Sequence, residues 1–169
     1  PNCKIMSIKA GYLNSGNSKV DFTTTTIIES INYAIAKGAH ILNMSFGGTV
    51  TSGEDTALHN SIKAAYAQNI LMIAAVGNDG KNLNISPEIP VRYDEVFGVG
   101  AIELTSQGTL STTPTAYTNY GNDVDFMAPG TRDSVVSKLW AKVWSDSTET
   151  SEETDSSDSS PELKLNFSA

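Results

Sequence analysis

Two short segments of the chain combine glycine with polar side chains directly after apolar runs. Ser45–Gly48 follows the short apolar segment 40–44, and Gly77–Gly80 follows the continuous apolar run 70–75. Short apolar runs that end at turn residues predict buried strands, and a continuously apolar strand is typical of a parallel sheet. Ligands bind at the carboxyl ends of strands in such sheets. The sequence therefore predicts a binding site at these two turns.

Few other residues could bind a metal or form a covalent link. Cys3 is the only cysteine, which excludes a disulfide within the chain and a cysteine-based zinc cluster. His40 and His59 are the only imidazoles, too few to favour a zinc site. We therefore assign no metal site from the residues themselves.

The elements that would position the two turns alternate between strands and helices. Apolar residues at helical spacing predict helices over residues 25–37 and 55–68. The predicted strands cover residues 4–10, 40–44, 70–75, 96–101 and 124–128, and residues 11–20 are predicted to form a loop. This order predicts an α/β fold with a mostly parallel sheet.

Charge and composition exclude several classes of function. The 169 residues carry a net charge of −8, but seven acidic residues and no basic one lie between Ser145 and Glu162. Residues 1–144 consequently carry a net charge of only −2 and form no basic cluster, so nucleic acid is not an expected partner. No apolar run approaches the ~20 residues of a membrane-spanning helix.

Five segments within about residues 1–132 resemble core segments of the subtilisin-like serine proteases, and they follow that family's order and approximate spacing. They are Ile41–Gly48, Ile73–Gly80, Pro90–Ala101, Tyr117–Gly121 and Asp125–Gly130. The resemblance implies a three-layer α/β domain with a mostly parallel sheet. It also implies a cis bond between Ile89 and Pro90. The similarity ends near residue 132, so we expect a partial domain that lacks the family's N-terminal and C-terminal catalytic segments.

The resemblance implies roles for seven residues at the two turns. Ser45, Phe46 and Gly47 would form one wall of the substrate-binding site, here called the first wall segment. Ala75, Val76 and Gly77 would form the opposite wall, the second wall segment. Asn78 would donate a hydrogen bond to the oxyanion that forms during peptide hydrolysis. Phe46 and Val76 would shape an apolar primary pocket. Taken without its flanking matches, Asn78 is more typical of an ordinary tight turn than of a catalytic donor, because asparagine tolerates left-handed geometry.

The catalytic triad of the family has no counterpart in this sequence. The chain contains no Asp-Thr-Gly or Asp-Ser-Gly, no His-Gly-Thr and no Gly-Thr-Ser. His40 precedes Ile41 and His59 precedes Asn60, so neither histidine fits the motif, and Ser134 and Ser137 lack the context of a nucleophile. Nucleophilic catalysis needs a base beside the serine and a group that orients the base. We expect this chain alone to be inactive.

The C-terminal residues do not resemble the family. Residues 133–144 form a divergent segment in which Leu139, Trp140, Val143 and Trp144 have helical spacing, as in a local helix or one that binds a partner. Residues 145–169 form an acidic tail rich in Ser, Thr, Glu and Asp, which we expect to be disordered. The chain also starts at Pro1 without a signal-peptide pattern, and we expect it to be processed or partial.

Three functions remain open at this stage. The chain is either a fragment or variant of a subtilisin-like endopeptidase, whose partner is a peptide or protein substrate, or an inactive binding or regulatory module derived from one. An unrelated nucleotide-binding domain is disfavoured, because Gly11–Gly16 is not a phosphate-binding loop. Family resemblance implies a secretory location and frequent calcium binding, but no Asp-rich loop can be assigned to calcium and no cofactor is assignable. We also expect association through uncovered sheet edges.

Overall fold

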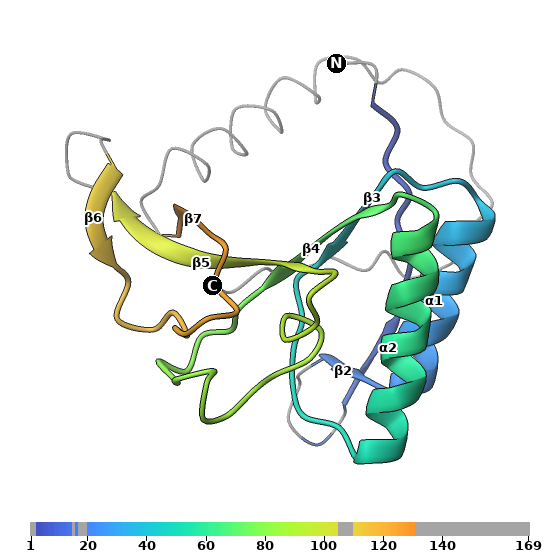
Figure 1. Cartoon of the computed structure of the whole chain (residues 1–169), viewed down its shortest axis with the longest axis horizontal. Helices are drawn as coiled ribbons and strands as arrows, with labels where there is room; N and C mark the ends of the chain where they lie inside the picture. The colour runs from blue at the N-terminus through green and yellow to red at the C-terminus, as the bar shows by residue number, and fades with distance from the viewer. Residues whose placement is uncertain (1–2, 15, 17–19, 105–109, 131–169) are drawn as a thin grey trace. The chain divides into compact units, whose positions relative to one another are not determined.

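The computed structural model describes residues 3–14, 16, 20–104 and 110–130 (Figure 1). These residues divide between two compact units. The first unit comprises residues 1–100 and 116–127, and the second comprises residues 101–115 and 128–169. The predictions for residues 133–144 and 145–169 lie outside the described residues.

The first unit contains both helices and the parallel part of the sheet. Strands β3 (Ile41–Met44), β4 (Leu71–Ala75) and β5 (Phe97–Leu104) pair in that order and run parallel, with Met44 beside Ala74 and Ala74 beside Gly98. Helix α1 (Thr24–Ala36) precedes β3, and helix α2 (Ser52–Ala67) connects β3 to β4. The predicted α/β fold with a mostly parallel sheet is therefore confirmed.

Four further strands complete the part of the chain that the structure describes. Strands β1 (Gly11–Leu13) and β2 (Val20–Phe22) form an antiparallel pair, and β7 (Phe126–Pro129) pairs with β5. In the second unit, the end of β5 pairs antiparallel with β6 (Leu110–Pro114).

The structure corrects two expectations about the start of the chain. Residues 4–10 are not a strand, and the segment predicted as a loop contributes the β1–β2 pair instead. Among the described residues, no strand lies beside residues 4–10 to complete their backbone hydrogen bonds, and Ile5 is 96% exposed. Strand β6 was not predicted, because Leu110–Pro114 is rich in Ser and Thr and shows little apolar alternation.

Both helices begin at reciprocal side-chain caps. The Thr26 backbone N–H donates to Thr23 Oγ1 at 3.1 Å, and the Thr23 N–H donates to Thr26 Oγ1 at 3.2 Å. At α2, the Thr51 N–H donates to Glu54 Oε2 at 3.3 Å. Such caps satisfy N–H groups that have no partner within the helix, so the local sequence itself specifies where these helices start.

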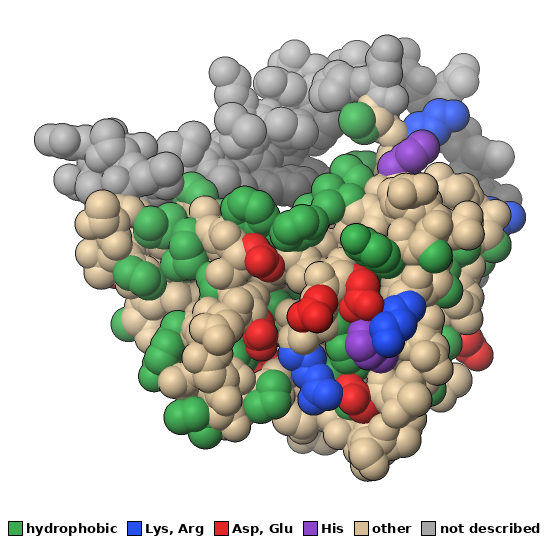
Figure 2. Space-filling model, in the orientation of Figure 1, with side chains coloured by type: hydrophobic (Ala, Val, Ile, Leu, Met, Phe, Trp, Pro, Cys, Tyr) green, Lys and Arg blue, Asp and Glu red, His purple; other side chains and the backbone are tan. Residues whose placement is uncertain are grey.

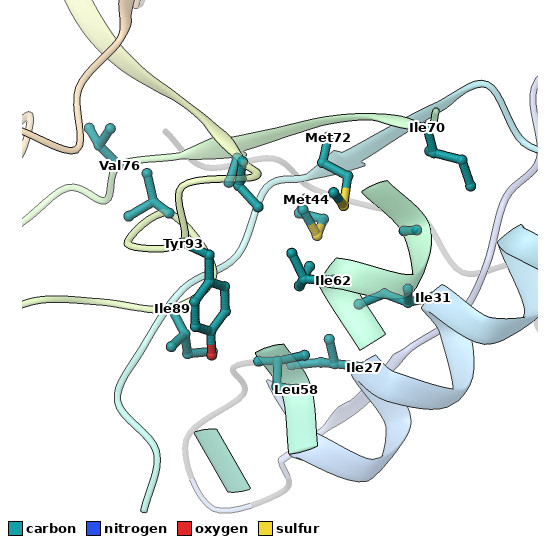
Figure 3. Packing of buried hydrophobic residues seen from close by; sticks show 14 of the residues in the cluster. Ile27, Ile31, Met44, Leu58, Ile62, Ile70, Met72, Val76, Ile89 and Tyr93 are labelled. Carbon is teal, nitrogen blue, oxygen red and sulfur yellow. The ribbon is translucent and has the colours of Figure 1, made fainter. Parts of the chain in front are cut away.

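The core lies between the helices and one face of the sheet (Figure 3). Ile27 and Ile31 of α1 and Ile62 of α2 pack with Met44 of β3 and Met72 of β4, and all five side chains are at most 5% exposed. The described residues thus supply the sheet and one helical layer of the predicted three-layer arrangement.

The opposite face of the sheet is apolar and exposed. The register places Ile41 beside Leu71, and Ile73 beside Phe97, on the side away from Met44 and Met72. Ile41 is 59%, Leu71 40% and Phe97 41% exposed. The apolar run 70–75 is typical of a strand covered on both faces, but among the described residues β4 is buried on one face only. Exposed hydrophobic side chains are visible in Figure 2.

We predict that this exposed sheet face causes the chain to self-associate. A double substitution of the neighbouring pair, Ile41→Glu with Leu71→Lys, should shift the chain toward monomer, because charged side chains oppose burial of the face. Size-exclusion chromatography with light scattering, over a tenfold concentration range, measures the change.

A matched control changes two exposed aromatic residues on the helices, Tyr33→Glu and Tyr66→Lys, which are 50% and 61% exposed in the parent chain. A parent chain that remains monomeric at every concentration, or a control that dissociates to the same extent, would contradict this prediction.

Candidate peptide-binding site

The parallel pairing of β3 and β4 brings the two predicted wall segments to the same edge of the sheet. Because Met44 lies beside Ala74, the chain leaves both strands at adjacent positions, and Ser45 and Ala75 are the next residues. Ser45, Gly47 and Ala75 are exposed. The structure therefore brings the two turns together as the sequence predicts.

Asn119 holds the second turn in place from outside it. Its side-chain Nδ2 donates to the Val76 carbonyl oxygen at 2.8 Å, and its Oδ1 accepts from the backbone N–H of Asp79 at 3.0 Å and of Lys81 at 2.9 Å. Its own backbone N–H donates to the Gly77 oxygen at 3.0 Å. With Asn119 only 1% exposed, this buried amide fixes the backbone on both sides of Asn78.

Gly77 is required at this turn for two reasons. Its φ of +97° lies in the region that other residues adopt only at a cost. A Cβ at this position would overlap the Asn119 side chain and lie 3.1 Å from Glu88 Oε2. The glycine therefore permits the close approach of the buried residues that support the turn.

The side chain of Asn78 is exposed and makes no hydrogen bond to the other described residues. Its backbone neighbours are held by Asn119, which fixes the backbone from which the side chain extends, and its amide N–H groups stay unpaired within this part of the chain. An amide donor presented in this way can bind a carbonyl oxygen or an anion.

The two residues expected to shape the primary pocket have different environments. Val76 is 2% exposed and packs in the core, so its side chain faces away from any ligand, and the surface of the second wall segment is formed by Ala75 and Gly77. Phe46 stacks on Phe22 with ring centroids 4.8 Å apart. It lines a pocket of about 510 Å³ together with Gly47, Phe22 and Ile27, and no residue of the second wall segment lines that pocket.

Two charged residues at the site were not found by sequence reasoning. Glu88 is only 8% exposed, and its Oε1 lies 3.1 Å from Lys81 Nζ. Lys81 Nζ also lies 2.8 Å from Asp79 Oδ2. The hydrogen bond to Asp79 is the main cause that raises the pKa of Lys81, and the hydrogen bond to Glu88 is the second. No local pattern marks Glu88, which reaches the site only through the fold. Asn119 lies in Tyr117–Gly121, one of the segments that resemble the family, and this is the sequence signal that points to it.

The segment that carries Glu88 is anchored at two points. Ile89 pairs with Gly48 through hydrogen bonds of 2.9 and 3.2 Å, and the Ile89–Pro90 bond is cis, as expected. Farther along, Tyr93 Oη donates to Asp55 Oδ1 of α2 at 2.8 Å. Burial is the main cause that raises the pKa of Tyr93, and this hydrogen bond is the second. These contacts place Glu88 beside the first wall segment.

The described residues contain neither a metal-binding cluster nor a membrane-spanning helix. In the part of the chain that the structure describes, no group of three or more His, Cys, Asp or Glu side chains is arranged to hold a metal ion. Within the same residues, no helix combines the length and the apolar character needed to cross a membrane.

Comparison with known proteins points to one family. The family model described as the subtilase family matches residues 1–163. Subtilisin DY of Bacillus licheniformis is 33% identical over 131 residues, which are 77% of this chain and 43% of that protein. The intracellular serine protease of Paenibacillus polymyxa is 35% identical over 133 residues, which are 77% of this chain and 36% of that protein.

Solved structures agree with this match. The structure of the prenylagaramide maturation protease PagA has a TM-score of 0.54 at 30% identity, and the match covers 68% of this chain and 39% of that one. A lanthipeptide protease has the same TM-score at 22% identity, which supports the fold alone. The chain spans less than half the length of each of these proteins.

We predict that Asn119→Ala destabilises the second turn. The substitution leaves the buried Val76 oxygen without its partner, which costs about 1–3 kcal/mol. It also removes the part-buried bonds to the N–H groups of Asp79 and Lys81, which water can replace in part. Urea denaturation measures the free energy of unfolding, and hydrogen exchange should show faster exchange at the Asp79 and Lys81 amides.

The matched control is Asn82→Ala, which removes one exposed hydrogen bond to the Asn84 N–H. We expect it to change the free energy of unfolding by less than about 1 kcal/mol. Equal effects of the two variants, or unchanged exchange at Asp79 and Lys81, would show that Asn119 does not support the turn.

Proposed function

The chain belongs to the subtilase family, and we propose that it is a substrate-binding part of a subtilisin-like serine endopeptidase. In this proposal, a peptide lies between the first wall segment (Ser45, Phe46 and Gly47) and the second (Ala75, Val76 and Gly77). The observation that supports it best is the exposed amide of Asn78, which no other described residue pairs, on a turn that a buried asparagine holds in place. The two walls leave one edge of a parallel sheet, where ligands bind in such folds.

In the proposed site, each group has a separate task. Ala75 and Gly77 contribute mainly backbone surface, since Val76 is turned into the core. Phe46 provides apolar surface on the side of the first wall segment that faces Phe22. The Asn78 amide would donate to the substrate carbonyl oxygen and more strongly to the oxyanion that develops from it. The bonds of Asn119 hold the backbone on both sides of Asn78, so the point from which its side chain extends is fixed before a substrate binds.

The bond-breaking groups are not part of this proposal. The sequence contains none of the three triad motifs, and the histidines lie elsewhere. His59 Nε2 contacts Glu95 Oε2 at 3.0 Å and its ring stacks on Tyr93. His40 precedes β3, so the length of the strand, about 13 Å, separates it from Ser45. Neither histidine is placed to activate a serine beside Asn78.

A second candidate function is an inactive binding or regulatory module derived from a subtilase. It uses the same site and is favoured by the absence of the triad motifs from the sequence. The nucleotide-binding alternative receives no support, because Gly11–Leu13 forms one strand of a hairpin rather than a phosphate-binding loop before a helix.

We predict that the chain binds product-like peptides, which end in a free carboxylate, through Asn78. Loss of a hydrogen bond to a charged group costs about 1.5–3 kcal/mol, so Asn78→Ala should raise Kd by about tenfold or more. Fluorescence anisotropy with a fluorescein-labelled pentapeptide measures the affinity, and Asn32→Ala, on the exposed surface of α1, is the matched control. Absence of binding, or a Kd that does not depend on Asn78, would refute the proposed site.

We further predict that the chain alone does not hydrolyse peptides. Incubation of the same peptide, extended by three residues beyond the expected cleavage point, should give no product above that of a protein-free control in mass spectrometry. Cleavage that follows the chain through purification and disappears in Asn78→Ala would instead show that it holds a complete catalytic centre.

A further inference from the structure

We propose that Glu88 selects peptides with a cationic side chain, lysine or arginine, at the residue that enters the space between the two wall segments. This inference rests on the proposed function, because it requires a peptide to bind there. It adds a chemical class of substrate and a specificity-determining residue that the resemblance did not identify.

The position of the Glu88 carboxylate is the first argument. A Cβ added to Gly77 would lie 3.1 Å from Glu88 Oε2, and a Cβ added to Gly47 would lie 3.5 Å from the same oxygen. Oε2 therefore lies within reach of both wall segments. Both neighbouring residues are glycines, so no side chain of these two positions covers the carboxylate. The Gly48–Ile89 backbone pair holds this arrangement.

The charge balance is the second argument. Lys81 Nζ lies 2.8 Å from Asp79 Oδ2 and 3.1 Å from Glu88 Oε1, so one ammonium serves two carboxylates. The group carries a net charge of −1. The side chains of Lys81 and Asp79 are 47% and 57% exposed, whereas that of Glu88 is 10% exposed. Water screens the Asp79–Lys81 pair much more than Glu88.

A buried carboxylate that is only partly paired favours a second cation. Burying a charge is costly unless it is paired and hydrogen-bonded, and Glu88 Oε2 has no hydrogen-bond donor among the described residues. A lysine or arginine side chain can place its aliphatic stem against the glycines and Ala75 while its charged end reaches Oε2. An uncharged side chain of equal length would fill the same space without this interaction.

A purely structural role for the Glu88–Lys81 pair makes a different prediction. If the pair only anchored the turn, substitution of Glu88 would change the free energy of unfolding but not the preference between peptides. The decisive readout is therefore the ratio of two affinities rather than a single affinity.

The experiment compares two product-like pentapeptides that are identical except at the last residue, which is arginine in one and the neutral isostere citrulline in the other. Fluorescence anisotropy gives Kd for each. We expect the parent chain to bind the arginine peptide about tenfold tighter or more, as for a hydrogen bond to a charged group. Glu88→Gln should bring the ratio close to one.

Two further variants keep the test decisive. Glu29→Gln, on the exposed surface of α1, makes the same change in net charge and should leave the ratio unchanged. Lys81→Met removes the cation that competes for Glu88 and should raise the ratio above that of the parent chain. Because Lys81 is half-exposed, this variant remains informative even if Glu88→Gln does not fold.

The possible results separate the two proposals. Equal binding of both peptides that still depends on Asn78 overturns the role of Glu88 and leaves the peptide-binding site intact. Failure to bind either peptide refutes the proposed function and this inference with it. Two other results also overturn the inference. One is a Kd ratio of the two peptides that is the same in Lys81→Met as in the parent chain. The other is a ratio that falls as much in Glu29→Gln as in Glu88→Gln.

Discussion

The parallel pairing of β3 with β4 is the constraint on which the proposed site depends. Met44 lies beside Ala74, so the backbone leaves both strands at one edge and the two wall segments begin side by side. A shift of one residue in this pairing would also exchange the buried and exposed faces. The core packing of Met44 and Met72 against the helices therefore fixes the register that forms the site.

Buried polar groups then complete what the strands begin. Asn119 bonds to the backbone on both sides of Asn78, and Glu88 approaches both walls where Gly47 and Gly77 leave space. The contacts of Asn119 with the second turn, and of Glu88 with Gly47, join segments that are more than 30 residues apart in the sequence. Only the contacts of Glu88 with the second turn are closer in sequence. Among the described residues, the core covers one face of the sheet only. The stability of the chain and its association with other chains therefore both depend on what covers Ile41, Leu71 and Phe97 on the other face.

Local sequence predicted the elements with strong local signals. Apolar spacing predicted both helices and strands β3 and β4, and the family resemblance predicted the cis bond at Pro90. Interactions between distant segments were not predictable in this way. Residues 4–10 alternate like a strand but pair with no strand in the described part of the chain. Nothing near Glu88 in the sequence indicates that it reaches Gly47. Val76, an apolar residue beside the turn, was expected at the pocket, but its side chain packs in the core.

The central claim is that two turns from neighbouring strands form one peptide-binding site. Titration of the ¹⁵N-labelled chain with the arginine-ended pentapeptide, followed by NMR, tests it most directly. The account predicts that the amides of residues 45–48 and 75–81 shift together with one common Kd, while amides of the buried face of α1, such as Ile31, remain unchanged. Shifts confined to one turn, or centred on the exposed sheet face around Ile41, would contradict it.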